Sequence, residues 1–163
     1  MTKDEYILNS ILKECYRHRK RLQYAYNRLK PIFPLTIDKL SNLTEEQVSI
    51  LDQLIYRFTK LQDAIGNKLF RSILIILDED IINKSQIDIF NRLEQLGIVK
   101  DYDKWKSLRN LRNELAHEYE TEEPFTVEVL NMLFSKIPDL ENYLFDIINY
   151  LRNRDLLNEF INS

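Results

Sequence analysis

The sequence predicts an all-α protein, an antiparallel bundle of four to five helices that forms a single domain over residues 1–163. Only two glycines and four prolines interrupt the chain, whereas Leu, Ile, Lys, Glu and Asn are abundant. Apolar side chains recur every three or four residues over long stretches, which is the period of an amphipathic helix. No segment shows a convincing strand pattern, and the length suits one domain.

The first helix is expected from about Lys3 to Lys30. It should end at the segment PIFP, because proline cannot continue a helix and restrains the residue before it. An apolar stripe along this helix should face the core, and it consists of Leu8, Leu12, Cys15, Leu22, Tyr26 and Leu29.

A linker should separate the first helix from the second, which is expected from about Glu45 to Leu77. Thr44 and Gln47 can form a capping box at its start, since each side chain can bind the backbone N–H of the other residue. Gly66 interrupts the apolar pattern of this helix and indicates either close packing or a bend.

Three further helices complete the expected bundle. One runs from about Gln86 to Leu96 and should stop at Gly97, a residue typical of helix ends. Another covers about Asp103 to Glu120. The last should start near Thr126, run to the C-terminus and be broken at Pro138.

Composition argues against several classes of protein. With two glycines, the chain lacks the loops that cradle phosphates or dinucleotides. The single cysteine, Cys15, cannot form an intramolecular disulfide or a cysteine zinc site, and its place on an apolar stripe suggests burial. The N-terminus carries no apolar run typical of a secretory signal, and the longest apolar run, ILIIL, is too short to span a membrane. A cytoplasmic protein without membrane association is therefore expected.

The charge distribution is uneven. A net charge of −3 gives no general attraction to nucleic acid. Residues 17–30, however, contain six Lys or Arg and no acidic residue, and they include Tyr24 and Tyr26. Such a patch can bind phosphates even on an acidic protein. The alternative is an ordinary solvated helix face, and His18 within this run has no spaced partner that would suggest a role.

The most informative segment is RNLRNELAHEYE, residues 109–120, on the fourth expected helix. Arg112 lies at the margin of that helix's apolar stripe, and no acidic residue lies three or four positions away to neutralise it. Its partner should be a carboxylate on another helix or a phosphate. Asp63 of the second helix could complete such a site, although pairing with Lys60 or Arg71 is the expectation favoured here.

His117 should point away from the apolar stripe, in line with Asn113. Histidine titrates near neutrality and can move protons to or from a ribose hydroxyl, and arginine can stabilise negative charge on phosphorus. Five residues of helix separate Arg112 from His117 by about 7.5 Å and about 140°. A second copy of the chain would supply another histidine, so that acid and base are separate groups, and this favours a dimer.

In this segment the sequence resembles the HEPN superfamily of helical nucleases and nucleotide-binding proteins. The family signature is Arg-polar-x3–5-His, which its toxin branch extends to Arg-x4-His-x-Tyr. The segment from Arg112 through Asn113 and His117 to Tyr119 matches each specified position. The stretch RFTKLQDAIGNKLF, residues 57–70, also looks like the second helix of toxin-branch members.

The resemblance implies a two-fold homodimer that cuts RNA without a metal ion or cofactor, with Arg112, Asn113 and His117 as catalytic residues. In the toxin branch the partner is a minimal nucleotidyltransferase (MNT) antitoxin, which is thought to silence the toxin by transferring AMP to the motif tyrosine. Here that tyrosine is Tyr119.

Two other functions stay open at this point. The chain could be a non-catalytic HEPN protein that binds nucleotide or substrate beside a nucleotidyltransferase, although an intact Arg and His favour the nuclease. It could also be a helical interaction module in which the motif is coincidental. Taken singly, Tyr119 could be a core residue, His117 an exposed polar residue and Arg112 a partner in an inter-helix ion pair.

Overall fold

The computed structural model describes residues 2–121 and 124–157, except for the side chain of Tyr119. It confirms the all-α fold, and no strand occurs in these two ranges. The helices are α1 (Lys3–Leu29), α2 (Ile37–Ser41), α3 (Glu45–Asp63), α4 (Phe70–Ile76), α5 (Gln86–Gln95), α6 (Tyr102–Thr121) and α7 (Val127–Asn153), with a 3-10 turn after α1 and a π-helical segment between α3 and α4.

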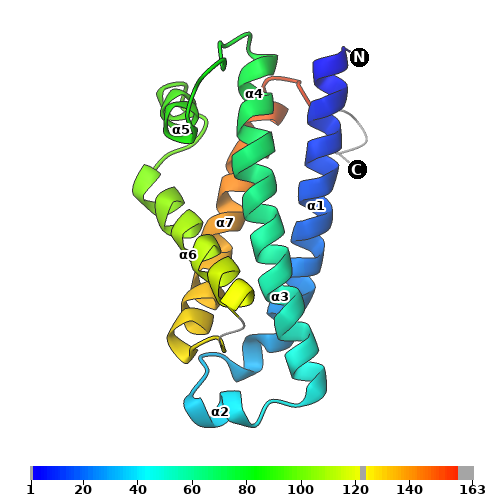
Figure 1. Ribbon diagram of the computed structural model, residues 1–163. Coiled ribbons are helices and arrows are strands. Elements are labelled where there is room, and N and C mark those ends of the chain that lie inside the picture. The colour runs from blue at the N-terminus through cyan, green and yellow to red at the C-terminus, as the bar shows by residue number, and fades with distance from the viewer. Residues whose placement is uncertain (1, 122–123, 158–163) are drawn as a thin grey trace.

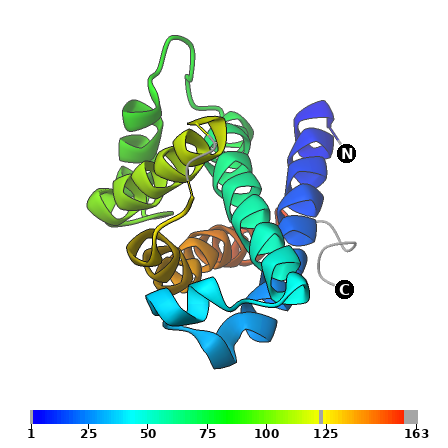
Figure 2. The same ribbon diagram turned by 60° about the horizontal axis from the view of Figure 1, so that its bottom comes forward.

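The long helices alternate in direction, which confirms an antiparallel bundle. In Figure 1, α1 descends from the N-terminus, α3 and α4 ascend as one continuous rod, α6 descends, and α7 returns behind them. Figure 2 shows α3 between α1 and α6. None of the described helices combines the length and the apolar character needed to cross a membrane.

The first helix follows its sequence pattern closely. Thr2 and Glu5 form a capping box before it, and a 3-10 turn containing Pro31 follows its end. Cys15 is fully buried, as expected for a cysteine on the apolar stripe, and this burial raises the pKa of its thiol to about 12. Tyr26 stacks on Phe134 of α7 with ring centroids 4.3 Å apart, which ties α1 to the last helix.

The second expected helix is continuous, but it changes from α-helix to π-helix and back to α-helix along its length. Thr44 and Gln47 form the expected capping box, and Ala64–Leu69 is π-helical. A Cβ placed on Gly66 would lie 2.9 Å from Cζ2 of Trp105 on α6. The structure thus supports close packing as the role of this glycine. The π segment begins directly after Asp63, the last residue of α3.

An aromatic cluster holds α6 in place around Trp105, which is 2% exposed. Its ring centroid lies 4.8 Å from that of Phe70 and 5.1 Å from that of Tyr143. The Tyr143 hydroxyl oxygen lies 2.9 Å from the carbonyl oxygen of Lys100 and 2.7 Å from that of Asp101, immediately before α6 begins, and its one proton is shared between these two acceptors. The cluster therefore anchors the start of α6 against both α4 and α7.

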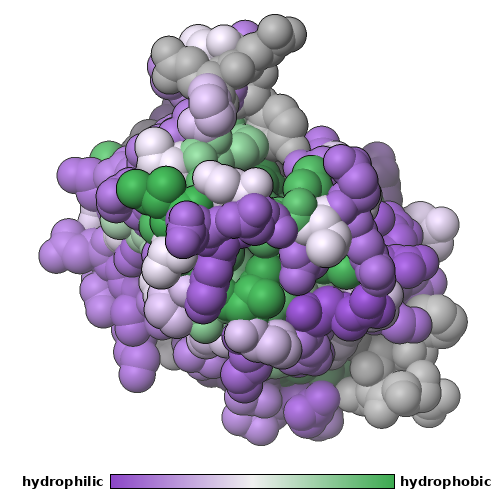
Figure 3. Space-filling model, turned by 90° about the horizontal axis from the view of Figure 1, so that it is seen from below, coloured by the Kyte–Doolittle hydropathy of each residue, from purple (hydrophilic) through white to green (hydrophobic). Residues whose placement is uncertain are grey.

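The linker before α3 is more ordered than its sequence suggests. It contains α2, a helix absent from the sequence prediction, with Thr36 as its N-cap. The backbone of Leu35 exchanges two hydrogen bonds with the Asn131 side chain, at 2.7 and 3.0 Å, which pins the linker to α7. Figure 3 looks onto this end of the bundle and shows apolar side chains set among polar ones. The exposed large apolar residues include Ile37 of α2 and Met132 of α7.

Two expectations for the last helix are wrong. Pro138 does not break α7, which continues through it to Asn153. Proline removes one backbone hydrogen bond, but buried Ile137 and Leu140 on either side hold the helix against the core, and this packing outweighs the loss. The helix also ends at Asn153, and residues 154–157 are not helical. Asp155 takes a left-handed conformation (φ 53°), which is typical of a residue that follows the end of a helix.

Substituting Gly66 with alanine should destabilise the protein. The new methyl group would meet the Trp105 ring, which its aromatic neighbours hold in place, and this cost should outweigh the gain of about 1 kcal/mol in helix propensity. We expect the free energy of unfolding to fall by about 1–2 kcal/mol in urea denaturation. Asp52→Ala, an exposed change in α3, is the matched control and should change stability by less than about 0.5 kcal/mol. Equal stability of both variants would contradict the packing role.

Candidate active site on α6

Arg112 is bound by Asp63, the last residue of α3. Its Nε lies 2.7 Å from Oδ1 and its Nη2 lies 2.9 Å from Oδ2, a bidentate ion pair in which both side chains are about 30% exposed (29% and 28%). The hydrogen bonds to Asp63 raise the pKa of Arg112, so the guanidinium stays charged. Its Nη1 donates to no other described residue, which leaves donors available beside the pair.

This pair corrects the expected pairing of Asp63 with Lys60 or Arg71. Lys60 instead places its Nζ 5.6 Å from the ring centroid of Tyr56, and Arg71 donates to the backbone carbonyl of Lys84. The end of α3 faces α6, and Asp63 therefore reaches Arg112. The structure thus supports the inter-helix carboxylate as the partner that Arg112 was expected to need.

Asn113 and His117 lie one helical turn apart on the exposed side of α6. No hydrogen bond or ion pair joins the His117 ring to another residue within the described ranges. Its backbone carbonyl accepts a hydrogen bond from Thr121 near the helix end. The structure therefore brings Arg112 together with Asp63, while His117 and Asn113 face solvent on an adjoining row of the same helix.

Comparison with known proteins assigns the chain to a protein family. A family model described as "Ribonuclease HepT-like" matches residues 36–147, which is more than half of the chain and includes Asp63, all of α6 and most of α7. The chain belongs to the HepT-like ribonuclease family. This family is of the HEPN type, which confirms the resemblance to the HEPN superfamily, whereas membership of its toxin branch stays a prediction. Comparisons with curated proteins and with solved structures give no match.

The other motif residue of this HepT-like protein is Tyr119. Its backbone belongs to α6, and its side chain lies outside the described part of the structure. Its suggested modification, and the alternative that it is a core residue, therefore stay predictions.

The HepT-like chain also buries a polar contact that the sequence did not suggest. His18 of α1 is 7% exposed, and its Nδ1 lies 2.9 Å from Nη1 of Arg57 on α3. Because Arg57 is permanently protonated, it must donate, and Nδ1 must accept. Burial and then the Arg57 charge lower the pKa of His18, which favours the neutral imidazole.

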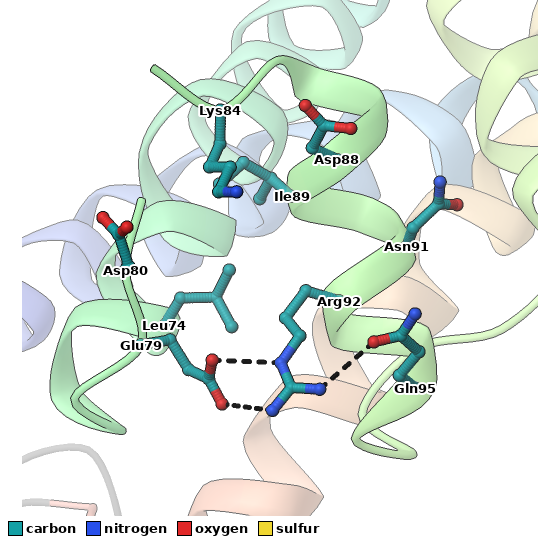
Figure 4. Close-up of a pocket in the computed structure, with 9 residues that line it drawn as sticks. All are labelled: Leu74, Glu79, Asp80, Lys84, Asp88, Ile89, Asn91, Arg92 and Gln95. Carbon is teal, nitrogen blue, oxygen red and sulfur yellow. Dashed lines mark hydrogen bonds and ion pairs between the residues drawn. The ribbon is translucent and has the colours of Figure 1, made fainter. Parts of the chain in front are cut away.

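A polar pocket of about 460 Å³ lies away from the motif, between the end of α4 and α5. A bidentate ion pair between Glu79 and Arg92 crosses it, with Arg92 also bound to Gln95 (Figure 4). Neither the motif residues nor Asp63 line this pocket. In the described ranges, no group of three or more His, Cys, Asp or Glu side chains is arranged to hold a metal ion.

Asp63 could have been recognised from one signal. It is the only acidic residue between positions 53 and 77, in a helix that the apolar pattern already places in the bundle. The ion pair between Asp63 and Arg112 forms because α6 packs beside α3. The spacing of residues in the sequence does not show which helices are neighbours.

The Asp63–Arg112 pair should contribute modestly to stability. We expect Asp63→Asn to lower the free energy of unfolding by about 1 kcal/mol, because the pair is partly exposed and solvent screens it. A double-mutant cycle with Arg112→Gln, followed by urea denaturation, should give a coupling energy of the same size. The exposed Arg92→Gln serves as the second mutation of a control cycle with Asp63→Asn and should show no coupling. Additive effects in the first cycle would contradict the pair.

Proposed function

We propose that this HepT-like protein is the toxin of a HEPN/MNT toxin–antitoxin pair, an endoribonuclease that cuts RNA without a metal ion. The observation that carries the proposal is an oriented arginine and an exposed histidine on one helix of a chain from a ribonuclease family. Together these groups can stabilise charge on a phosphate and move protons, which is what phosphodiester cleavage requires.

In the proposed reaction, one histidine takes the proton of the ribose 2′-hydroxyl as its oxygen attacks the adjacent phosphorus. The bond from phosphorus to the 5′-oxygen breaks, and a second histidine donates a proton to that leaving oxygen. Arg112 stabilises the added negative charge on the phosphoryl oxygens through the donors that Asp63 leaves unused. Asn113, next to Arg112 and exposed, would bind and orient the substrate.

This reaction needs two copies of the chain. The chain has two histidines, and His18 is buried against Arg57, so one protomer offers only His117 as an accessible acid or base. A second His117 would come from an isologous partner whose α6 lies across a two-fold axis. The dimer is thus part of the proposal, since it supplies the separate acid and base.

The proposed nuclease activity should depend on Arg112 and His117. We expect Arg112→Ala and His117→Ala each to lower the rate of RNA cleavage by about 10²–10³, because each removes a group that acts in the transition state. Full activity should persist in excess EDTA. Cleavage of a labelled RNA, followed by gel electrophoresis with circular dichroism as the folding control, measures both effects. Undiminished cleavage by both variants would exclude the proposed site.

Mixing the two inactive variants tests whether the reaction needs both histidines. Because the proposed reaction uses the His117 of both protomers, a mixed dimer, which holds one intact His117, should stay inactive. Regained activity would show that a single histidine suffices and would contradict the two-histidine mechanism. A wild type that binds nucleotide without cleaving RNA would instead support the non-catalytic HEPN function.

The proposed partner is an MNT antitoxin that transfers AMP from ATP to the Tyr119 hydroxyl. Tyr119 follows His117 by two residues, at the same end of α6. A phosphodiester at this position would add negative charge and bulk near the place where RNA phosphate must bind, which would repel the RNA and neutralise the positive charge of Arg112.

Silencing should therefore require Tyr119. Co-expression with a cognate nucleotidyltransferase should add the mass of AMP to the wild type and abolish its toxicity. Tyr119→Phe should stay folded and toxic and should gain no mass, as measured by intact-protein mass spectrometry and growth curves. Tyr24→Phe, an exposed tyrosine on α1, is the control and should be modified like the wild type. Modification and silencing of Tyr119→Phe would show that another residue is the acceptor.

A further inference from the structure

The outward side of α3 carries an unusual group of side chains between α1 and α6. Tyr56 is half exposed, and two cations lie over its ring: Cζ of Arg57 at 5.2 Å and Nζ of Lys60 at 5.6 Å from the centroid. Lys60 is three residues, or about 4.5 Å of helix rise, before Asp63, which holds Arg112. This aromatic and basic group therefore adjoins the candidate active site.

The neighbouring face of α1 extends the positive charge. Arg17, Arg21 and Arg28 lie in one row, because separations of four and eleven residues bring a helix back to nearly the same face. Arg28 reaches α3 and binds Glu46 there, so the row borders α3. Further along the antiparallel pair, His18 contacts Arg57. Arg17 and Arg21 are both exposed on this border.

Several arginines of this protein form an ion pair with a carboxylate, whereas the cations near Tyr56 and on the neighbouring face of α1 do not. Arg19, Arg28, Arg92 and Arg112 each bind a carboxylate. Within the described ranges, Arg17, Arg21, Arg57 and Lys60 form no ion pair. The Nε of Arg57 is also buried without a hydrogen-bond partner in those ranges, although its Nη1 is bound to His18. Two cations over the Tyr56 ring and two on the neighbouring border of α1 thus have no ion-pair partner among the described residues.

We propose that Arg17, Arg21, Tyr56, Arg57 and Lys60 form a binding surface for single-stranded RNA, the α1–α3 surface, which leads the strand to Arg112. This inference rests on the proposed function and names how its substrate is held. The cations bind backbone phosphates, and the exposed part of the Tyr56 ring stacks on a base. The ring favours RNA over an acidic peptide, because a peptide carboxylate would use the cations alone.

Binding is measured in the His117→Ala background, so that the RNA stays intact. The probe is a fluorescein-labelled single-stranded RNA of mixed sequence, followed by anisotropy at several salt concentrations. The test variant combines Arg17→Gln, Arg21→Gln and Lys60→Gln, and it leaves Arg57 in place because of its contact with buried His18. The control variant removes the same charge elsewhere, through Lys3→Gln, Lys100→Gln and Arg152→Gln, all at exposed positions.

The test variant should bind RNA at least about tenfold more weakly than the parent, and the slope of log K against log salt should fall by about two. The control variant should keep both close to the parent values. Tyr56→Ala should weaken binding about tenfold and Tyr56→Phe should not, since phenylalanine keeps the ring. Tyr6→Ala, at another exposed tyrosine, should bind like the parent.

The outcomes separate this inference from the nuclease assignment. If the protein with His117 intact binds RNA without cutting it and the surface variants bind weakly, the surface stands and the nuclease function fails. If it cuts RNA and the test variant binds and cuts like the control variant, the α1–α3 surface is wrong and the nuclease function stands. Absence of RNA binding by the parent protein overturns the surface outright. With the nuclease active, the surface variants should raise KM and leave kcat nearly unchanged.

Discussion

The contact between Trp105 and Gly66 determines where α6 lies on the long central rod. Because Gly66 has no side chain, the indole ring approaches the π-helical segment to a distance that a Cβ would prevent. Phe70 and Tyr143 pack around the same ring and keep it from moving. With the start of α6 anchored in this way, Arg112, two turns further along, arrives opposite Asp63 at the end of α3.

The Asp63–Arg112 pair is better understood as an orienting contact than as a source of stability. A pair of this exposure contributes little free energy, because solvent screens the charges and competes for the hydrogen bonds. Its two parallel bonds nevertheless define the plane of the guanidinium, which a single bond would not. An arginine held in this plane can meet a phosphate without the entropy cost of ordering a free side chain, which suits a site in a ribonuclease family.

The charges of this protein are distributed unevenly over its surface, and the net charge does not show this. The overall charge is negative, yet the side of the bundle formed by α1, α3 and α6 carries cations that no described carboxylate neutralises. A net charge of −3 gives no general attraction to nucleic acid. A local positive surface beside a candidate active site can then act where the substrate strand needs to be held.

The sequence by itself determined the helical class, the main helix positions and the motif helix. Spacing and capping signals act over three or four residues, so Thr44 with Gln47 and the Leu108–Leu115 spacing could be interpreted without knowing any neighbour. The exposure of His117 and the burial of Cys15 follow from the same periodicity. Only the tertiary structure decided which helices meet. Packing between distant segments determines the partner of Arg112, the contact of His18 with Arg57, the helix in the linker and the continuity of α7 through Pro138. Local sequence patterns cannot predict these features, because they do not show which segments pack together.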